Sequence, residues 1–327
     1  MTTRPRFLSR TLLILTLLGP TRAVAAARFS TFWPGMKRGL LEYSAQVIGI
    51  FDRWELKGIK RDGVWFTYAL KFAAAQGAVD SQKLDYLSIS FDSHRSEQFD
   101  AYLRQSIGDE FFRQGKGLLL LDTGYAGGIL KAIRSRYPQH EDRIQALFTA
   151  SNNPQVMVSR VFQVAAYGTD ALKTNPADLL EDSHQIETHL PKFHGRASHY
   201  ELQGSIWVPA HYAKNDTHLD GNIDPAAHVE HRKDLGAYME RNHELLESRI
   251  SLWRNLKQLA TSDRPGLISK LKSVLANTDD SFSEAIVRDM VDFYPSLVAL
   301  EQVGLAPVPG AHQRGPVSCL SLIAAAH

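Results

Sequence analysis

Residues 118–128, Leu-Leu-Leu-Leu-Asp-Thr-Gly-Tyr-Ala-Gly-Gly, decide the fold that this sequence predicts. The four leucines have no polar residue between them, which is typical of a strand buried on both faces of a parallel sheet. The glycines that follow turn the chain into a helix, which is expected to start near Gly128 and to end near Pro138. A buried strand joined to a helix by a tight turn predicts an α/β fold.

The flanking sequence adds further strands and helices. Residues 84–90 alternate apolar and polar side chains, and residues 144–150 form a third apolar run. Ser96 is placed to cap a helix whose apolar stripe runs from residue 99 to 111, and Asp62-Gly63 opens an earlier helix after a helical stretch at 38–60. The order strand, helix, strand, helix, strand predicts a small parallel, Rossmann-like sheet.

The second half of the chain differs in composition and in its pattern of apolar residues. A polar, histidine-rich stretch is expected to form short strands or a lid, and helices are expected at 237–259 and from the capping box Ser281/Glu284 to just before Pro295. The predicted organisation is therefore a signal peptide (1–27), an α/β core (28–171), a polar histidine-rich insertion or lid (172–234), a helical region (235–304) and a flexible tail (305–327).

The N-terminus predicts export. Arg4, Arg6 and Arg10 precede a short apolar run at 12–18, and an alanine-rich stretch at 23–27 offers an A-x-A cleavage site. The apolar run is too short for a bilayer about 30 Å thick. An uncleaved N-terminal membrane anchor is the alternative interpretation, whereas cleavage leaves no stable membrane insertion.

The net charge and the cysteine content bear on the partner and the location of the protein. The 327 residues carry 37 basic and 35 acidic side chains, a net charge of +2. Loss of four leader arginines, Arg22 among them, turns +2 into −2, which argues against a nucleic-acid partner. The lone Cys319 excludes an intramolecular disulfide, and an exported protein without disulfides fits a bacterial periplasm.

Asp122 is the main candidate for chemistry. It follows the leucine run at the carboxyl end of a predicted parallel strand, where open α/β sheets bind ligands. The residues after it predict an anion cradle of backbone N–H groups at a helix N-terminus. The cradle residues are Thr123, Gly124, Tyr125, Gly127 and Gly128. In the alternative interpretation, Asp122 caps the helix and the glycines serve close packing.

A carboxylate beside an anion site repels the anion unless it holds a cation or attacks phosphorus itself. A site with Mg²⁺ or Zn²⁺ resolves this conflict, with Asp92, which follows the strand at 84–90, as second carboxylate and metal ligand. Arg95 lies close by for an anionic substrate. Arg196 and His199 are expected to reach over the crevice as part of a substrate lid.

The Asp-Thr-Gly triplet at 122–124 also admits a second chemistry. A hydrophobic run followed by these residues resembles the active-site turn of aspartic proteases, in which two aspartates share one proton and activate water. Because a single triplet is present, this alternative requires a homodimer and an all-β surround.

Three blocks carry a family resemblance: Arg61-Asp62-Gly63 at the start of a helix, the strand at 86–90, and residues 99–103 leading to the turn at 121–127. In this order they resemble the haloacid-dehalogenase-related proteins encoded beside bacterial surface-polysaccharide genes. Gly128 stands where those proteins usually have Ser or Thr, and the nucleophile signature D-x-D is not evident. The resemblance covers about residues 55–135 and implies a phosphate-recognising α/β fold.

Histidines gather in the insertion and just beyond it. Nine of the 13 histidines fall between residues 184 and 243. An alternative metal site is therefore His218 and Asp220 with His228 and His231, for zinc or another metal. The other interpretation is that these are loop and surface histidines without a metal.

Together these observations predict an exported hydrolase that acts on a phosphorylated or anionic small molecule or sugar. A non-catalytic phosphate-binding, sugar-binding or scaffold protein that keeps the cradle is the competing hypothesis.

Overall fold

The computed structural model describes the chain except residues 1–8, 61–62, 79–83, 91–92, 109–110, 113–115, 125–126, 152, 154–155, 176–177, 180–196, 212–224, 277–280 and 305–327. The strands are β1 (Trp54–Lys60), β2 (Leu84–Ser88), β3 (Gly117–Gly124), β4 (Ile144–Ala150), β5 (Met157–Val158), β6 (Ala197–Gln203) and β7 (Ile206–His211). The α-helices are α1 (Ser9–Ile50), α2 (Val64–Ala75), α3 (Phe99–Ile107), α5 (Gly128–Arg136), α6 (Arg160–Tyr167), α8 (Pro225–Arg241), α9 (His243–Ser262), α10 (Arg264–Ala276) and α11 (Ser281–Gly304). Short 3-10 helices are η2 (Ser93–Arg95), η3 (Pro138–Arg143) and η4 (Thr169–Lys173).

A parallel sheet of five strands forms the centre of the molecule, in the order β2-β1-β3-β4-β5. In this sheet, Gly58 of β1 lies opposite Leu121 of β3, and Gly124 of β3 lies opposite Ala150 of β4. The predicted α/β class, with a parallel sheet and a helical C-terminal part, is confirmed.

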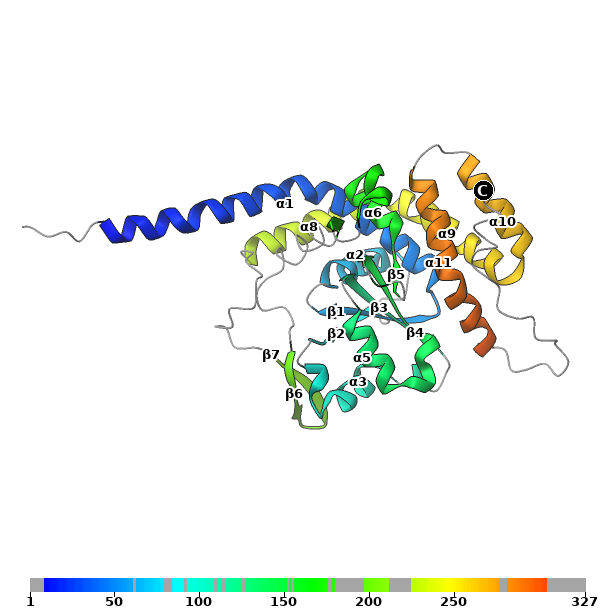
Figure 1. The fold of residues 1–327 in the computed structure, drawn as a ribbon, viewed down its shortest axis with the longest axis horizontal. Helices are drawn as coiled ribbons and strands as arrows, with labels where there is room; N and C mark the ends of the chain where they lie inside the picture. Colours follow the sequence, from blue (N-terminus) through cyan, green and yellow to red (C-terminus); the bar gives the residue numbers. More distant parts are fainter. Residues whose placement is uncertain are drawn as a thin grey trace, which may run out of the picture.

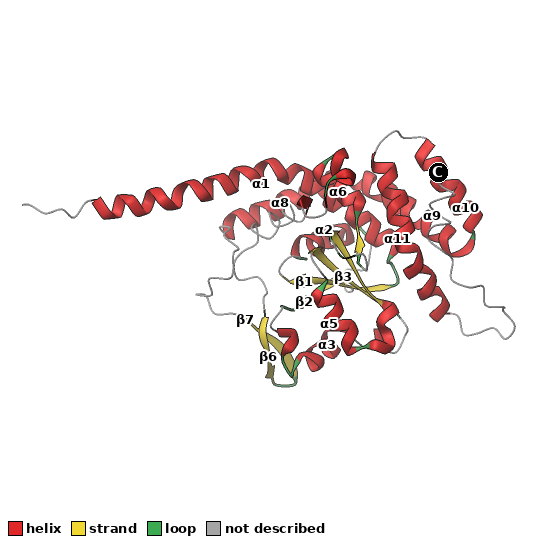
Figure 2. Ribbon diagram, viewed as in Figure 1, coloured by secondary structure: helices red, strands yellow, loops and turns green. Residues whose placement is uncertain are grey.

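The leucine run in β3 faces both sides of the sheet. Leu119 and Leu121 belong to the larger apolar cluster, which includes residues of α1, α2, α9 and α11. Leu118 and Leu120 belong to a second cluster with residues of α3 and α5. Figure 2 shows these helices on opposite sides of the strands. Each buried leucine stabilises the fold by about 1.5–3 kcal/mol, so the run fixes β3 in the middle of the sheet.

Helix α1 is the largest contributor to the first cluster. It begins inside the predicted signal peptide and continues without a break to Ile50. From Trp33 onward most of its side chains are buried, and it packs on α6 and α9 (Figure 1). Among the described residues, no helix combines the length and the apolar character that a membrane span requires.

The expectation of helix throughout residues 38–60 is wrong after Ile50, and residues 54–60 form β1. Trp54, Leu56 and Ile59 are buried on the two faces of this strand. Glu55 and Lys57, which made the segment look amphipathic, form an ion pair of 3.2 Å. Burial between two neighbouring strands outweighs the helix propensity of Glu, Leu and Lys.

Helix ends also differ from the predictions. α3 stops at Ile107 because Gly108 takes a left-handed conformation (φ 83°). The predicted helix at 237–259 is two helices that meet at Asn242. α11 continues through Pro295 instead of ending before it, and the buried Phe293 and Leu297 on either side pack into the core. Tertiary packing there exceeds the local cost of proline.

The predicted insertion contains an antiparallel hairpin of β6 and β7, so short strands are present as expected. The first turns of α8 also fall inside it, since this helix starts at Pro225.

Candidate functional site

The strand order places one crossover at the centre of the sheet. From β1 the chain moves to β2 on one side, and it then returns to β3 on the other side of β1. In open parallel sheets of this order, ligands bind at the carboxyl ends of the two strands where the direction changes. Here these are the ends of β1 and β3, and Asp122 lies at the end of β3.

Asp122 is almost fully buried, with 7% of its surface exposed. Its Oδ1 accepts a hydrogen bond of 2.9 Å from the backbone N–H of Thr123. Tyr43 of α1 lies close to this carboxylate. Burial raises the pKa of the Tyr43 phenol, and the negative charge of Asp122 raises it further. Tyr43 therefore stays protonated, and its hydroxyl donates to the Leu147 carbonyl at 2.7 Å.

Thr123 is anchored through its backbone. Its carbonyl accepts the hydroxyl of Thr149 in β4, whose own carbonyl accepts a hydrogen bond of 2.6 Å from Gln163 Nε2 of α6. The Thr123 side chain is 1% exposed, and its Oγ1 has no hydrogen-bond partner in the described part of the chain. The end of β3 is thus tied to β4, and β4 to α6, by hydrogen bonds. As neighbours in one strand, Asp122 and Thr123 direct their side chains to opposite faces of the sheet.

The two glycines before α5 have different roles. Gly127 caps the helix in a left-handed conformation (φ 72°), and a Cβ there would lie 3.1 Å from Val156 Cγ2. A Cβ on Gly128 would meet no described atom within 4 Å, so a larger residue fits there. The first turn of α5 has backbone N–H groups without partners inside the helix, and the anion cradle predicted there stays a prediction.

The β1 side of the crossover is closely packed against β3. A Cβ on Gly63 would lie 2.4 Å from the Leu121 carbonyl oxygen, so only glycine allows this approach. The Gly63 carbonyl accepts a hydrogen bond of 3.0 Å from the hydroxyl of Thr67 in α2. The close approach of Gly63 to Leu121 places the start of α2 against β3, the strand that carries Asp122.

Several predicted site residues lie outside the described residues: Asp92, Tyr125, Arg196, His218 and Asp220. Arg95 is described and exposed, and it ends η2, which follows the edge strand β2. β1 separates that strand from β3. Thr123, Gly124, Gly127 and Gly128 lie together with Asp122 at the end of β3 and the start of α5.

The hairpin docks on α3 and the end of β2. Tyr200 stacks on Tyr102 with ring centres 4.2 Å apart, and its hydroxyl donates to the Ser88 carbonyl at 3.0 Å. The side chain of His199 is about half exposed and contacts Glu201 within the hairpin at 3.1 Å. The hairpin of the predicted lid therefore contacts the β2 side of the sheet.

His228 and His231 lie on α8 and pack on aromatic rings. His228 is 4% exposed, and its ring centre lies 4.9 Å from that of Trp65. His231 lies 5.0 Å from Trp33, and burial lowers its pKa. Within the described ranges, no group of three or more His, Cys, Asp or Glu side chains is placed to hold a metal ion.

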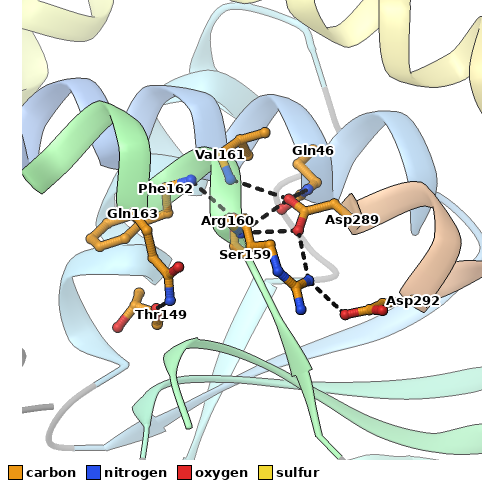
Figure 3. A network of polar contacts seen from close by, with 9 residues as sticks. All are labelled: Gln46, Thr149, Ser159, Arg160, Val161, Phe162, Gln163, Asp289 and Asp292. Carbon is orange, nitrogen blue, oxygen red and sulfur yellow. Dashed lines mark hydrogen bonds and ion pairs between the residues drawn. The ribbon is translucent and has the colours of Figure 1, made fainter. Parts of the chain in front are cut away.

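A buried carboxylate that sequence reasoning missed is Asp289 of α11, which is 0% exposed (Figure 3). It accepts the backbone N–H groups of Arg160 and Val161 at the start of α6, at 3.0 and 3.2 Å, and Gln46 Nε2 of α1 at 2.7 Å. The helical spacing from Ile286 and Phe293 places Asp289 on the buried face of α11, which was the available signal. This network joins three helices and lies apart from Asp122.

Comparison with protein-family models, with curated proteins and with solved structures found no match to this chain. The haloacid-dehalogenase resemblance therefore remains a prediction from short motifs. The geometry defines an α/β protein with a buried aspartate and a glycine-lined helix start at the central crossover of its sheet.

Proposed function

We propose that the protein is an exported hydrolase of a phosphorylated or anionic small molecule or sugar, with Asp122 as its reactive carboxylate. The observation that carries the proposal is the position of Asp122, buried at the carboxyl end of β3 beside the crossover to β1. A buried carboxylate at the ligand edge of a parallel sheet is placed for chemistry rather than for solubility.

In the proposed reaction, Asp122 attacks phosphorus while the bond from phosphorus to the leaving alkoxide breaks. The alkoxide takes a proton from solvent, and water then attacks the phosphoryl-aspartate, which releases phosphate and restores the carboxylate. The N–H groups at the start of α5 stabilise the negative charge of the phosphoryl oxygens. Gly127 shapes this cradle through its left-handed backbone.

A divalent cation would neutralise the repulsion between Asp122 and the substrate. The Asp122 carboxylate would be a ligand of this cation, and carboxylate oxygen suits Mg²⁺ better than Zn²⁺. The second carboxylate of the proposal, Asp92, lies outside the described residues. Mg²⁺ bound here would supply charge neutralisation.

A turnover assay tests this proposal. Release of phosphate from p-nitrophenyl phosphate and from phosphorylated sugars is measured with Mg²⁺, with Zn²⁺ and with EDTA. Asp122→Asn is compared with the matched control Asp170→Asn, whose carboxylate is exposed on η4. We expect Asp122→Asn to lower kcat at least 100-fold and the control to retain it. Equal activity of the wild type and Asp122→Asn under every condition would reject the hydrolase.

One observation favours the alternative of a non-catalytic binding protein. Asp122 Oδ1 already accepts the Thr123 N–H, which engages one of the two carboxylate oxygens. In that case phosphorylated sugars bind the purified protein in calorimetry but are recovered unchanged. The aspartic-protease alternative loses its structural support, because the Asp-Thr-Gly triplet ends a strand of a parallel α/β sheet instead of lying in an all-β fold.

A further inference from the structure

Three cationic side chains converge on two tyrosine rings at the β1 side of the crossover. Lys60, the last residue of β1, and Lys71 of α2 place Nζ 5.8 and 5.0 Å from the centre of the Tyr86 ring. Arg232 of α8 places Cζ 4.4 Å from the centre of the Tyr68 ring. We call these five residues the basic tyrosine cluster.

The cations of this cluster have no carboxylate partner in the parts of the chain that the structure describes, and this distinguishes them from their neighbours. On the same helix as Arg232, Lys233 pairs with Glu230 at 2.8 Å. The nearby Asp85 accepts the backbone N–H of Tyr86 at 2.7 Å. Cation–π contacts hold the three side chains in place but leave their charge uncompensated. Such a concentration of positive charge favours the binding of an anion.

The cluster is connected to the site around Asp122. The Tyr86 side chain lies close to Thr67, which helps to set the pKa of its phenol, and the Thr67 hydroxyl donates to the Gly63 carbonyl at 3.0 Å. Gly63 in turn packs against the Leu121 carbonyl, next to Asp122. Lys60 and Ser88 are register partners at the carboxyl ends of β1 and β2. The cluster therefore lies at the same edge of the sheet as Asp122, across β1.

We propose that the basic tyrosine cluster binds a second anionic group of the ligand whose first anionic group lies at Asp122. This inference rests on the proposed function and sharpens it, since the preferred ligand becomes a small molecule with two anionic groups, such as a sugar bisphosphate. Lys60, Lys71 and Arg232 pair with the second group. The rings of Tyr68 and Tyr86 hold these three side chains in position for the contact.

Calorimetric titration of the full chain tests the proposal, with fructose, fructose 6-phosphate and fructose 1,6-bisphosphate as probes. The variants are the triple substitution Lys60→Gln, Lys71→Gln, Arg232→Gln, the matched surface control Lys233→Gln, and Asp122→Asn. We expect the wild type and the control to bind the bisphosphate at least 10-fold more tightly than the monophosphate. The triple variant should bind both phosphates with equal affinity and show a weaker dependence on salt.

The outcomes separate this inference from the proposed hydrolase. A bisphosphate preference that the triple variant loses supports the cluster, even if the wild type has no turnover. If the triple variant keeps the bisphosphate preference, or if the wild type has none, the proposed role of the cluster is wrong. This holds even if turnover depends on Asp122. The conservative variant Lys60→Arg, Lys71→Arg, Arg232→Lys controls for folding, because it keeps the charge and should keep the preference.

Discussion

At the residue scale, the start of α5 depends on one glycine and not on its neighbour. Gly127 has a left-handed backbone and little room for a Cβ, whereas Gly128 has neither constraint. We expect Gly127→Ala to lower the free energy of unfolding by about 1–2 kcal/mol, and Gly128→Ala to leave it unchanged or to raise it by about 0.5 kcal/mol. Urea denaturation of both variants measures this. Equal effects would contradict the assigned roles.

Asp289 gives the stability of the protein a defined pH dependence. Burial raises its pKa to about 6, whereas the value in the unfolded chain is 3.8. The folded state therefore binds a proton that the unfolded chain releases near pH 4, so stability from this group is full below that pH and is lost as the pH rises through about 6. The loss is on the order of 3 kcal/mol.

The test is the pH dependence of urea denaturation between pH 4 and 7 for Asp289→Asn and for Asp292→Asn, whose side chain is 40% exposed and contacts the same arginine. The first substitution should remove this fall in stability, and the second should keep it. A fall of the same size in both variants would show that Asp289 is not its source.

The position of Asp122 could be predicted from sequence because strand, turn and helix are consecutive in the chain. Its surroundings could not be predicted, because Tyr43, which lies near Asp122, and Gln163, which bonds the Thr149 carbonyl, come from helices remote in sequence and carry no local signal. The same holds for the basic tyrosine cluster, because Arg232 reaches the Tyr68 ring only once α8 packs on α2.

At the scale of elements, the hairpin depends on a few polar anchors. The Tyr200 hydroxyl donates to the Ser88 carbonyl and contacts the Ser93 hydroxyl, both at 3.0 Å, and Gln105 exchanges two hydrogen bonds with the backbone of Trp207, at 2.9 and 2.6 Å. We expect Tyr200→Phe to keep the ring stacking but to weaken docking by about 1–2 kcal/mol. Faster amide hydrogen exchange in β6 and β7 would report this, and the exposed His199→Ala is the control. Unchanged exchange in Tyr200→Phe would contradict the anchoring role.

The strands that the sequence predicts correctly are recognisable from their own residues. The leucines of β3 and the apolar run of β4 identify buried strands without reference to any neighbour. β1 was missed because Glu55 and Lys57 give it the composition of a helix, and their ion pair forms only inside the sheet. α11 was predicted to end before Pro295, although packing of Phe293 and Leu297 carries it further.

At the scale of the whole molecule, α1 supports the large apolar cluster from Trp33 onward. Removal of residues 1–27, the predicted signal peptide, stops short of that residue. We expect the shortened protein to keep its free energy of unfolding within about 0.5 kcal/mol, because the described core contacts of α1 remain. Removal of residues 1–41, which deletes Met36, Leu40 and Leu41 as well, should prevent cooperative unfolding. Thermal denaturation distinguishes these results, and a large loss of stability on removing 1–27 would contradict the assignment.

The central claim is that an anionic ligand binds at the edge of the sheet formed by Asp122 and the start of α5. Hydrogen exchange measured by mass spectrometry, with and without millimolar tungstate as a phosphate mimic, tests it most directly. We expect slower exchange of the amides at 127–131, with no change in the hairpin at 197–211. Unchanged exchange at 127–131, or protection confined to the hairpin, would contradict it.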